Sequence, residues 1–357
     1  MATGATKFSF DDPLSPERTV TQLTQVTLDV SAIICAYTEA RWYDLVAAVE
    51  SLRRQSKPPS EIIVVVDHNQ RLLERVRAEL SGVMVVESNG PQGLSGARNS
   101  GIAVARGTRI AFLDDDAAAE PDWLARLYQY FDDPRVLAVG WTVEPVWPSK
   151  PPIWFPNEFY WIVGCSYQNL PGTPMVVRNP FGGCVCYRRE VFEVVGGFRT
   201  GIGRIGTLPM GCDETELCIR ASQRWPQKVF LIEPQARIHH RIPPSRACWR
   251  YFRSRCYAEG LSKAIVTQHV GAKDSLASER AYTLRTLPRG VLCNMKNSII
   301  HRDRAGFQRA GVIVAGLIIT TIGYLVGTFS RYLGDFRRAI ASNEALPELA
   351  GDSPDIK

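Results

Sequence analysis

The sequence predicts an α/β protein in which helices flank a mostly parallel central sheet, followed by a helical C-terminal region. Three observations lead to this prediction. Strand-like and helix-like segments alternate through the first 140 residues, and an uncharged apolar segment of twenty residues lies near the C-terminus. The 357 residues are 45% hydrophobic and 22% charged, as in a globular protein. The net charge of +6 is too small and too scattered to indicate nucleic-acid binding, so we expect no nucleic-acid partner.

Hydrophobic periodicity predicts the individual elements of the first part. A continuous apolar run predicts a strand over 26–35, and apolar residues at helical spacing predict a helix over 43–54. Segment 147–174 is rich in Pro and aromatic residues without periodicity, and we expect it to be a long loop outside the core. The same patterns predict strands over 61–66, 83–87, 108–113 and 182–187, and helices over 71–80, 94–106, 189–195 and 211–225.

Polar side chains follow each of the first four predicted strands. Ligands of parallel α/β sheets bind at the carboxyl ends of the strands, so these side chains predict a binding site at that edge. They are Tyr37 and Glu39 after the first strand, Asp67 after the second, Asn89 after the third, and Asp114, Asp115 and Asp116 after the fourth.

The three consecutive aspartates indicate a cation. Adjacent carboxylates repel one another, and a divalent ion offsets their charge. Asp114 and Asp116 alternate along the chain and are the candidate ligands of Mn²⁺ or Mg²⁺, which would stabilise a nucleotide diphosphate as a leaving group. The alternative is a solvated turn or a helix N-cap, because Pro121 follows closely.

Several motifs, taken in order, resemble family 2 glycosyltransferases with the GT-A fold. The resemblance covers about residues 28–240, and the small ratio of Lys (8 of 42 basic residues) fits a bacterial member from a GC-rich genome. The motifs are VSAIICAYTEA, IIVVVDHN, Asn89-x-x-x-Gly93-x-x-Gly96-Ala97-Arg98-Asn99-x-Gly101, the aspartate triplet, Phe181-Gly182-Gly183, Arg188-Arg189-Glu190-Val191-Phe192, Gly196-Gly197-Phe198 and Asp213-Glu214-Thr215-Glu216-Leu217-Cys218-Ile219-Arg220.

The resemblance implies a donor site for a nucleotide-diphosphate sugar. Tyr37, Glu39 and Asp67 would line the nucleoside pocket, although the same residues could cap strand-to-helix turns. Arg98 would contact the nucleotide or form a buried salt bridge with the aspartates. Asp114 would also face the donor, and Asp115 would assist the sugar hydroxyls or only the turn.

The resemblance also implies a general base and a further ligand. The family's acidic pair matches Asp213-Glu214 here in the reverse order of residue types, so Glu214 is the expected base in an inverting transfer, with Asp213 as the alternative. The helix dipole would favour both acids without any catalytic role. A His near this region helps to hold metal or diphosphate in some GT-A enzymes, which makes His239 a candidate ligand beside His240.

The C-terminal region predicts membrane association. Residues 311–330 carry no charge and would form a helix of about 30 Å, and Gly323-x-x-x-Gly327 has a spacing that allows close helix packing in lipid. Basic residues on both sides give no orientation, so the helix could span the membrane, lie in its interface or take part in a homo-oligomer; a buried core helix is the alternative. Six Arg between 237 and 255, without an acid, could grip a diphosphate, an anionic lipid-linked acceptor or the membrane surface.

These observations divide the chain and rank its functions. We expect a polar leader (1–25), a GT-A domain (26–240), an Arg-rich helical region near the acceptor and the membrane (241–309), an apolar helix (310–333) and a polar tail (334–357). The nine Cys predict reduced thiols, with Cys184 and Cys186 as packing residues. The leading function is a metal-dependent inverting glycosyltransferase at the cell membrane, facing the cytoplasm, with a lipid-linked or cell-envelope glycan acceptor. The alternatives are an inactive membrane-bound scaffold and a sugar-phosphate nucleotidyltransferase.

Overall fold

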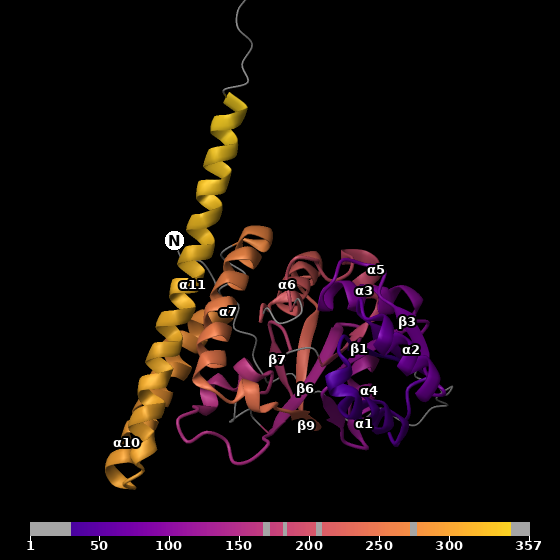
Figure 1. Ribbon diagram of the computed structural model, residues 1–357, viewed down its shortest axis with the longest axis horizontal. Helices are drawn as coiled ribbons and strands as arrows, with labels where there is room; N and C mark the ends of the chain where they lie inside the picture. Colours follow the sequence, from indigo (N-terminus) through magenta and orange to yellow (C-terminus); the bar gives the residue numbers. More distant parts are fainter. Residues whose placement is uncertain (1–29, 167–171, 181–183, 205–208, 272–276, 344–357) are drawn as a thin grey trace, which may run out of the picture.

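The computed structural model describes residues 30–166, 172–180, 184–204, 209–271 and 277–343, and these form a mixed sheet with helices packed on it (Figure 1). The predicted α/β class is therefore confirmed. The nine strands of the sheet follow the order β3-β2-β1-β4-β8-β6-β9-β5, and β7 pairs with β9 beside this path. The predicted leader, the motif at 181–183 and the last part of the predicted tail lie outside the described residues.

The first half of the sheet is parallel, as the alternating pattern predicts. β2, β1 and β4 lie side by side in parallel register, and β3 extends the sheet beyond β2. Asn69 caps α2 by accepting a hydrogen bond from the backbone N–H of Leu72. The elements are β1 (Val30–Ala36), α1 (Trp42–Arg53), β2 (Glu61–Val66), α2 (Gln70–Glu79), β3 (Met84–Glu87), α3 (Leu94–Val104) and β4 (Arg109–Asp114).

The second half of the sheet is mixed. β8 runs antiparallel to both β4 and β6, β6 and β9 are parallel, and β5 and β7 are antiparallel to β9. The register of β6 with β9 shifts between Trp141 and Thr142, where residues 234–236 of β9 have no partner. The elements are β5 (Ala117–Ala119), α4 (Trp123–Tyr128), β6 (Val136–Val146), β7 (Met175–Val177), β8 (Val185–Arg188), α5 (Arg189–Val195), α6 (Asp213–Arg224) and β9 (Val229–Arg241).

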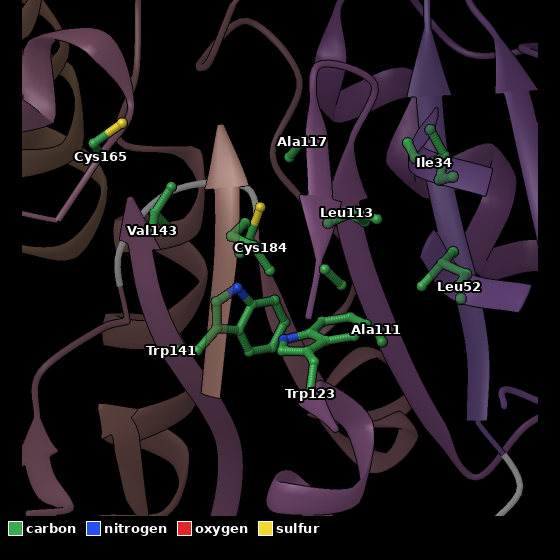
Figure 2. Packing of buried hydrophobic residues seen from close by; sticks show 14 of the residues in the cluster. Ile34, Leu52, Ala111, Leu113, Ala117, Trp123, Trp141, Val143, Cys165 and Cys184 are labelled. Atoms are coloured by element: carbon green, nitrogen blue, oxygen red, sulfur yellow. The ribbon is translucent and has the colours of Figure 1, made fainter. Parts of the chain in front are cut away.

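The core lies on both faces of the sheet. Figure 2 shows one cluster, in which the rings of Trp123 and Trp141 meet edge to face with centroids 4.4 Å apart. Cys184 and Cys186 are buried in this cluster, so the packing role predicted for them is confirmed. All nine cysteines are free thiols.

The expectation of a loop outside the core over 147–174 is wrong for its middle part. Residues Asn157–Val163 form a short 3-10 helix, and Phe155, Phe159, Ile162 and Val163 are almost fully buried. The burial arises because the C-terminal helices cover this segment. Phe155 and Phe159, for example, contact the ring of Phe252 on the first of those helices.

The C-terminal region is helical. It comprises α7 (Trp249–Val270), α9 (Ala277–Ala281), a π-helical turn (Tyr282–Thr286), α10 (Leu287–Ile300) and α11 (Arg304–Asn343). α11 is longer than the predicted apolar helix at both ends. By length and composition, its segment Arg304–Ser330 is the one helix among the described residues that is able to cross a membrane. In Figure 1, α7 lies between α11 and the sheet.

Candidate active site

A cavity of about 730 Å³ lies at the carboxyl ends of β1, β2 and β4. The strand ends supply Tyr37, Asp67 and the three aspartates, as predicted for this edge of a parallel sheet. The opposite wall comes from α7 and α11, which contribute Arg255, Lys263 and Tyr324 among others. The cavity therefore lies between the sheet domain and the C-terminal helices.

Asp114, Asp116 and His240 form a cluster at the end of β4. One ligand atom of each lies within 4.8 Å of the others, and Nε2 of His240 is 2.9 Å from Oδ1 of Asp116. Burial alone would lower the pKa of His240, but the Asp116 carboxylate outweighs it and the pKa rises to about 10. Burial alone would raise the pKa of Asp116, but His240, Arg41 and Arg246 hold it below its ordinary value. The contact with His240 thus offsets part of the carboxylate charge, and a metal ion bound here would take the place of the imidazole proton.

This cluster fits a divalent cation. Carboxylate oxygens and an imidazole nitrogen suit Mn²⁺, and the carboxylates also suit Mg²⁺. Oδ2 of Asp116 is buried and accepts no hydrogen bond within the described residues, although the guanidinium groups of Arg41 (3.1 Å) and Arg246 (3.6 Å) face it. Asp114 and Asp116 are therefore brought together as the predicted ligand pair.

The histidine of this cluster is His240, not the predicted His239. Successive side chains of a strand point to opposite sides, and β9 turns His240 toward the aspartates. His239 lies outside the cavity, with Nε2 3.3 Å from Glu120 and Nδ1 3.7 Å from Glu144. Its half-buried ring thus makes polar contacts at the surface of the protein.

Arg41, which sequence analysis missed, organises the aspartates. Its Nη1 lies 2.7 Å from Oδ1 of Asp115 and 3.1 Å from Oδ2 of Asp116. Burial raises the pKa of Asp115 to about 7 although Arg41 opposes this. Asp115 thus contacts Arg41 through Oδ1, and its Oδ2 accepts no hydrogen bond in the described part; its role toward the sugar hydroxyls stays a prediction. The sequence signal that could have revealed Arg41 is a basic residue in the loop after β1, close to Tyr37 and Glu39.

Of the predicted nucleoside-pocket residues, Tyr37 and Asp67 line the cavity and Glu39 does not. Asp67 already accepts a hydrogen bond from the backbone N–H of Gly93 (2.9 Å), which holds the loop before α3 against β2. The amide of Asn69 donates to Glu39 (3.1 Å), so Glu39 supports the turn after β1. This contact agrees with the structural alternative weighed for Glu39, whose place in a nucleoside pocket stays a prediction.

The predicted acid pair lies at the start of α6 and lines the same cavity. Nη1 of Arg98 lies 2.6 Å from Asp213, and Nη2 is 3.9 Å from Asp114, so one buried guanidinium connects the two acidic groups. Burial, and then the neighbouring Asp213 carboxylate, raise the pKa of Glu214 well above its ordinary value. Arg98 holds Asp213, and Glu214 is the acid that faces the cavity without an ion-pair partner among the described residues.

The helical wall carries a chain of ion pairs that sequence analysis missed in part. Arg255 contacts Glu259 (2.7 Å), Lys263 contacts both Glu259 (3.1 Å) and Glu279 (2.6 Å), and Arg178 contacts Glu279 (2.7 Å). Arg255 belongs to the noted Arg run, and its partner Glu259 lies one turn along the same helix. The packing of α9 against α7 then adds Glu279, which joins Lys263 to Arg178.

Comparison with known proteins places this site in a family. Residues 31–196 match the family model described as glycosyl transferase family 2. The chain is 31% identical over 305 residues to "Glucosyl-dolichyl phosphate glucuronosyltransferase" of Haloferax volcanii, which covers 84% of this chain and 96% of that protein. The chain belongs to glycosyltransferase family 2. The membership confirms the family that the motifs indicated.

Further relatives of this glycosyltransferase include the "Succinoglycan biosynthesis protein ExoM" of Rhizobium meliloti, 25% identical over 83% of this chain and 94% of that protein. Among solved structures, GalNAc-T7 with UDP, GalNAc and Mn²⁺ aligns with a TM-score of 0.48 and 17% identity, over 66% of this chain and 48% of that one. Because the relatives include an archaeal protein, the bacterial origin of this glycosyltransferase stays a prediction.

Proposed function

We propose that this glycosyltransferase is a metal-dependent, inverting enzyme that moves a sugar from a nucleotide-diphosphate sugar to a hydroxyl of a lipid-linked saccharide. One observation supports this most strongly: the Asp114–Asp116–His240 cluster and the Asp213–Glu214 pair line a single cavity. We place the enzyme at the cell membrane with its catalytic domain on the cytoplasmic side. A homo-oligomer stays a prediction.

The acceptor class rests on two supports. The Haloferax relative, similar over nearly its whole length, is named for a dolichyl phosphate acceptor substrate, glucosyl-dolichyl phosphate. In addition, Leu317, Thr320 and Tyr324 of the apolar helix α11 line the cavity itself. A lipid-linked acceptor held beside this helix would reach the strand ends without leaving the membrane surface.

The residues have distinct roles in the proposed transfer. Glu214 takes the proton of the acceptor hydroxyl, whose oxygen attacks the anomeric carbon as the bond to the nucleoside diphosphate breaks, with inversion. Arg98 keeps Asp213 in place beside the base. Asp114, Asp116 and His240 would hold Mn²⁺ or Mg²⁺, which supplies charge stabilisation for the departing diphosphate. Tyr37 and Asp67 would bind the nucleoside.

The test is transfer by the full chain in detergent, with UDP-, GDP- and dTDP-sugars as donors and a polyprenyl-phosphate glycoside as acceptor. Glu214→Gln should lower turnover by about 10²–10⁴-fold, while metal-dependent nucleotide binding persists. Glu193→Gln, an exposed acid on α5, is the matched control and should match the wild type. The anomeric configuration of the product, read by NMR, checks inversion.

The pH profile gives a second readout. A general base acts only when deprotonated, so turnover should fall as the pH drops through the pKa of Glu214. Because that pKa is raised above the ordinary 4.5, the loss should occur at a higher pH than for an unperturbed glutamate. Full activity of Glu214→Gln would remove its role as base. If no nucleotide binds with metal and no donor is used, the inactive scaffold becomes the better explanation.

A further inference from the structure

The outward side of α11 carries a continuous apolar stripe. Phe307, Val314, Ile318, Ile322 and Phe329 follow one another at steps of four or seven residues, and each is between 48% and 63% exposed. The stripe extends from residue 307 to residue 329, or about 33 Å of helix. Protein does not cover it within the described residues, and a monomer seldom leaves so long an apolar surface without a partner.

α10 extends this surface sideways. Leu292, Met295, Ile299 and Ile300 point away from the protein and are 40% to 68% exposed. α10 packs against the beginning of α11, where Gly306 lies against the backbone of Asn294. In Figure 1, α10 and α11 occupy one edge of the molecule, on the far side from α5. We call these exposed residues of α10 and α11 the outer face.

The charge around the outer face is positive. Segment 280–302 contains no acidic residue, so its cations are not neutralised along the chain. A helix with exposed apolar residues and neighbouring Arg and Lys is typical of binding to an anionic lipid surface. The exposed cations are Arg280, Arg285, Arg289, Lys296, Arg302 and Arg304.

The inner side of α11 is occupied by α7. A Cβ at Gly323 would collide with the carbonyl oxygen of Tyr257, a Cβ at Gly260 would collide with that of Thr320, and a Cβ at Gly327 would lie 2.8 Å from Ala264. The Gly323-x-x-x-Gly327 spacing that predicts helix packing in lipid therefore receives α7 of the same chain. α11 is attached along most of its apolar length.

This attachment bears on how the helix meets a membrane. α7 carries Arg255, Glu259 and Lys263 at the level where it contacts α11. If α11 crossed a bilayer, α7 and these ion-paired charges would enter the hydrocarbon with it, and charged side chains within a bilayer are costly. A position along the surface keeps α7 in the protein and exposes only the outer face to lipid.

We propose that the outer face binds an anionic bilayer in one leaflet, so that α11 lies along the membrane surface instead of crossing it. The basic residues contact the lipid headgroups, and the apolar residues enter the boundary of the acyl chains. This inference concerns lipid binding and is independent of the proposed transfer reaction.

Vesicle binding tests the surface. Purified full chain, freed of detergent, should float with vesicles of phosphatidylcholine and phosphatidylglycerol, and less with phosphatidylcholine alone. Leu292→Glu with Ile299→Glu should reduce binding by about tenfold or more. Arg289→Gln with Lys296→Gln should reduce it by about fivefold for each cation, or about 1 kcal/mol each, and high salt should have the same effect. Val194→Glu, an exposed apolar residue on α5, is the matched control and should bind normally.

Labelling tests the orientation in the wild-type fold. Cys293 on α10 is exposed, and vesicles should protect it from a membrane-impermeant maleimide, whereas a cysteine introduced by Val194→Cys should stay reactive. With the catalytic domain outside, a cysteine introduced by Ser353→Cys, beyond the described residues, should also react without detergent. Reaction at position 353 only after detergent would show a spanning helix and overturn the proposal. Dimers in ultracentrifugation without vesicle binding would overturn it too, because a second copy would then cover the outer face.

Discussion

The two walls of the cavity treat charge differently. The sheet wall, formed by Asp114, Asp115, Asp116 and His240, keeps buried carboxylate oxygens that accept no hydrogen bond in the described part of the chain. The helical wall, formed by α7 and α11, carries charges on α7 that continue through Glu279 of α9 to Arg178 as a chain of ion pairs. The density of charge alone therefore does not identify a ligand site. The sheet wall differs because ligand atoms of Asp114, Asp116 and His240 lie within 4.8 Å of one another.

The largest expected effect comes from removing one carboxylate of the sheet wall. Asp116→Ala removes a candidate metal ligand and should lower turnover by at least about a hundredfold. It also leaves His240, Arg41 and Arg246 without their common anion, so the free energy of unfolding should fall by about 3–5 kcal/mol. Asp122→Ala, an exposed aspartate on the same chain segment, should cost about 1 kcal/mol or less. Unchanged activity of Asp116→Ala would contradict a functional metal cluster.

On the helix wall, a substitution should affect stability more than metal binding. Lys263→Met leaves Glu259 and Glu279 with one partner each and should cost about 3–5 kcal/mol in chemical denaturation. Lys228→Met breaks a more exposed pair with Glu190 and should cost about 1 kcal/mol or less. If Lys263→Met weakened Mn²⁺ binding as much as Asp116→Ala does, the two walls would not differ in metal binding.

The pH dependence of stability follows from the same wall. Burial alone would raise the pKa of Glu259, but Lys263 and Arg255 outweigh it and lower the pKa to about 2. A lowered carboxyl pKa stabilises the folded state above the ordinary value of 4.5, and this contribution is lost as the pH falls from 4.5 toward 2. In Lys263→Met, the loss of stability over this acid range should be smaller, as measured by denaturant titration at each pH.

Substitutions of the two neighbouring histidines of β9 test which of them belongs to the metal cluster of the sheet wall. His240→Asn should weaken Mn²⁺ binding by more than about tenfold in calorimetry, because the imidazole belongs to the cluster. His239→Asn removes only exposed contacts with Glu120 and Glu144 and should leave the affinity unchanged. A larger loss of Mn²⁺ affinity for His239→Asn than for His240→Asn would instead make His239 the metal ligand, as the sequence predicted.

The smallest expected effect tests the packing of α11 against α7. Gly323→Ala forces a Cβ against the backbone of Tyr257 and should cost about 1–3 kcal/mol in thermal unfolding. Gly311→Ala meets nothing within 4 Å on the same helix, so higher helix propensity should stabilise it by up to about 1 kcal/mol. If both substitutions stabilise the chain, α7 does not hold α11 in solution.

Sequence reasoning succeeded where position along the chain determines position in space. Strands of a parallel sheet end at one edge, so Asp67 and the aspartates after β4 could be assigned to one site. It failed where the outcome depends on strand phase or helix packing. The unpaired residues 234–236 set which histidine of β9 faces inward. The contacts of Glu279 with Lys263 and Arg178, and the burial of Phe159, exist only after the C-terminal helices pack.

The two indoles beneath the sheet wall have a spectroscopic consequence. Trp123 and Trp141 are buried, perpendicular and 4.4 Å apart between ring centroids (Figure 2). Aromatic rings held so rigidly in an asymmetric setting give a near-ultraviolet circular dichroism signal that disappears when tertiary packing loosens. The protein therefore carries its own optical indicator of core integrity, and Trp123→Phe would show how much of the signal this pair contributes.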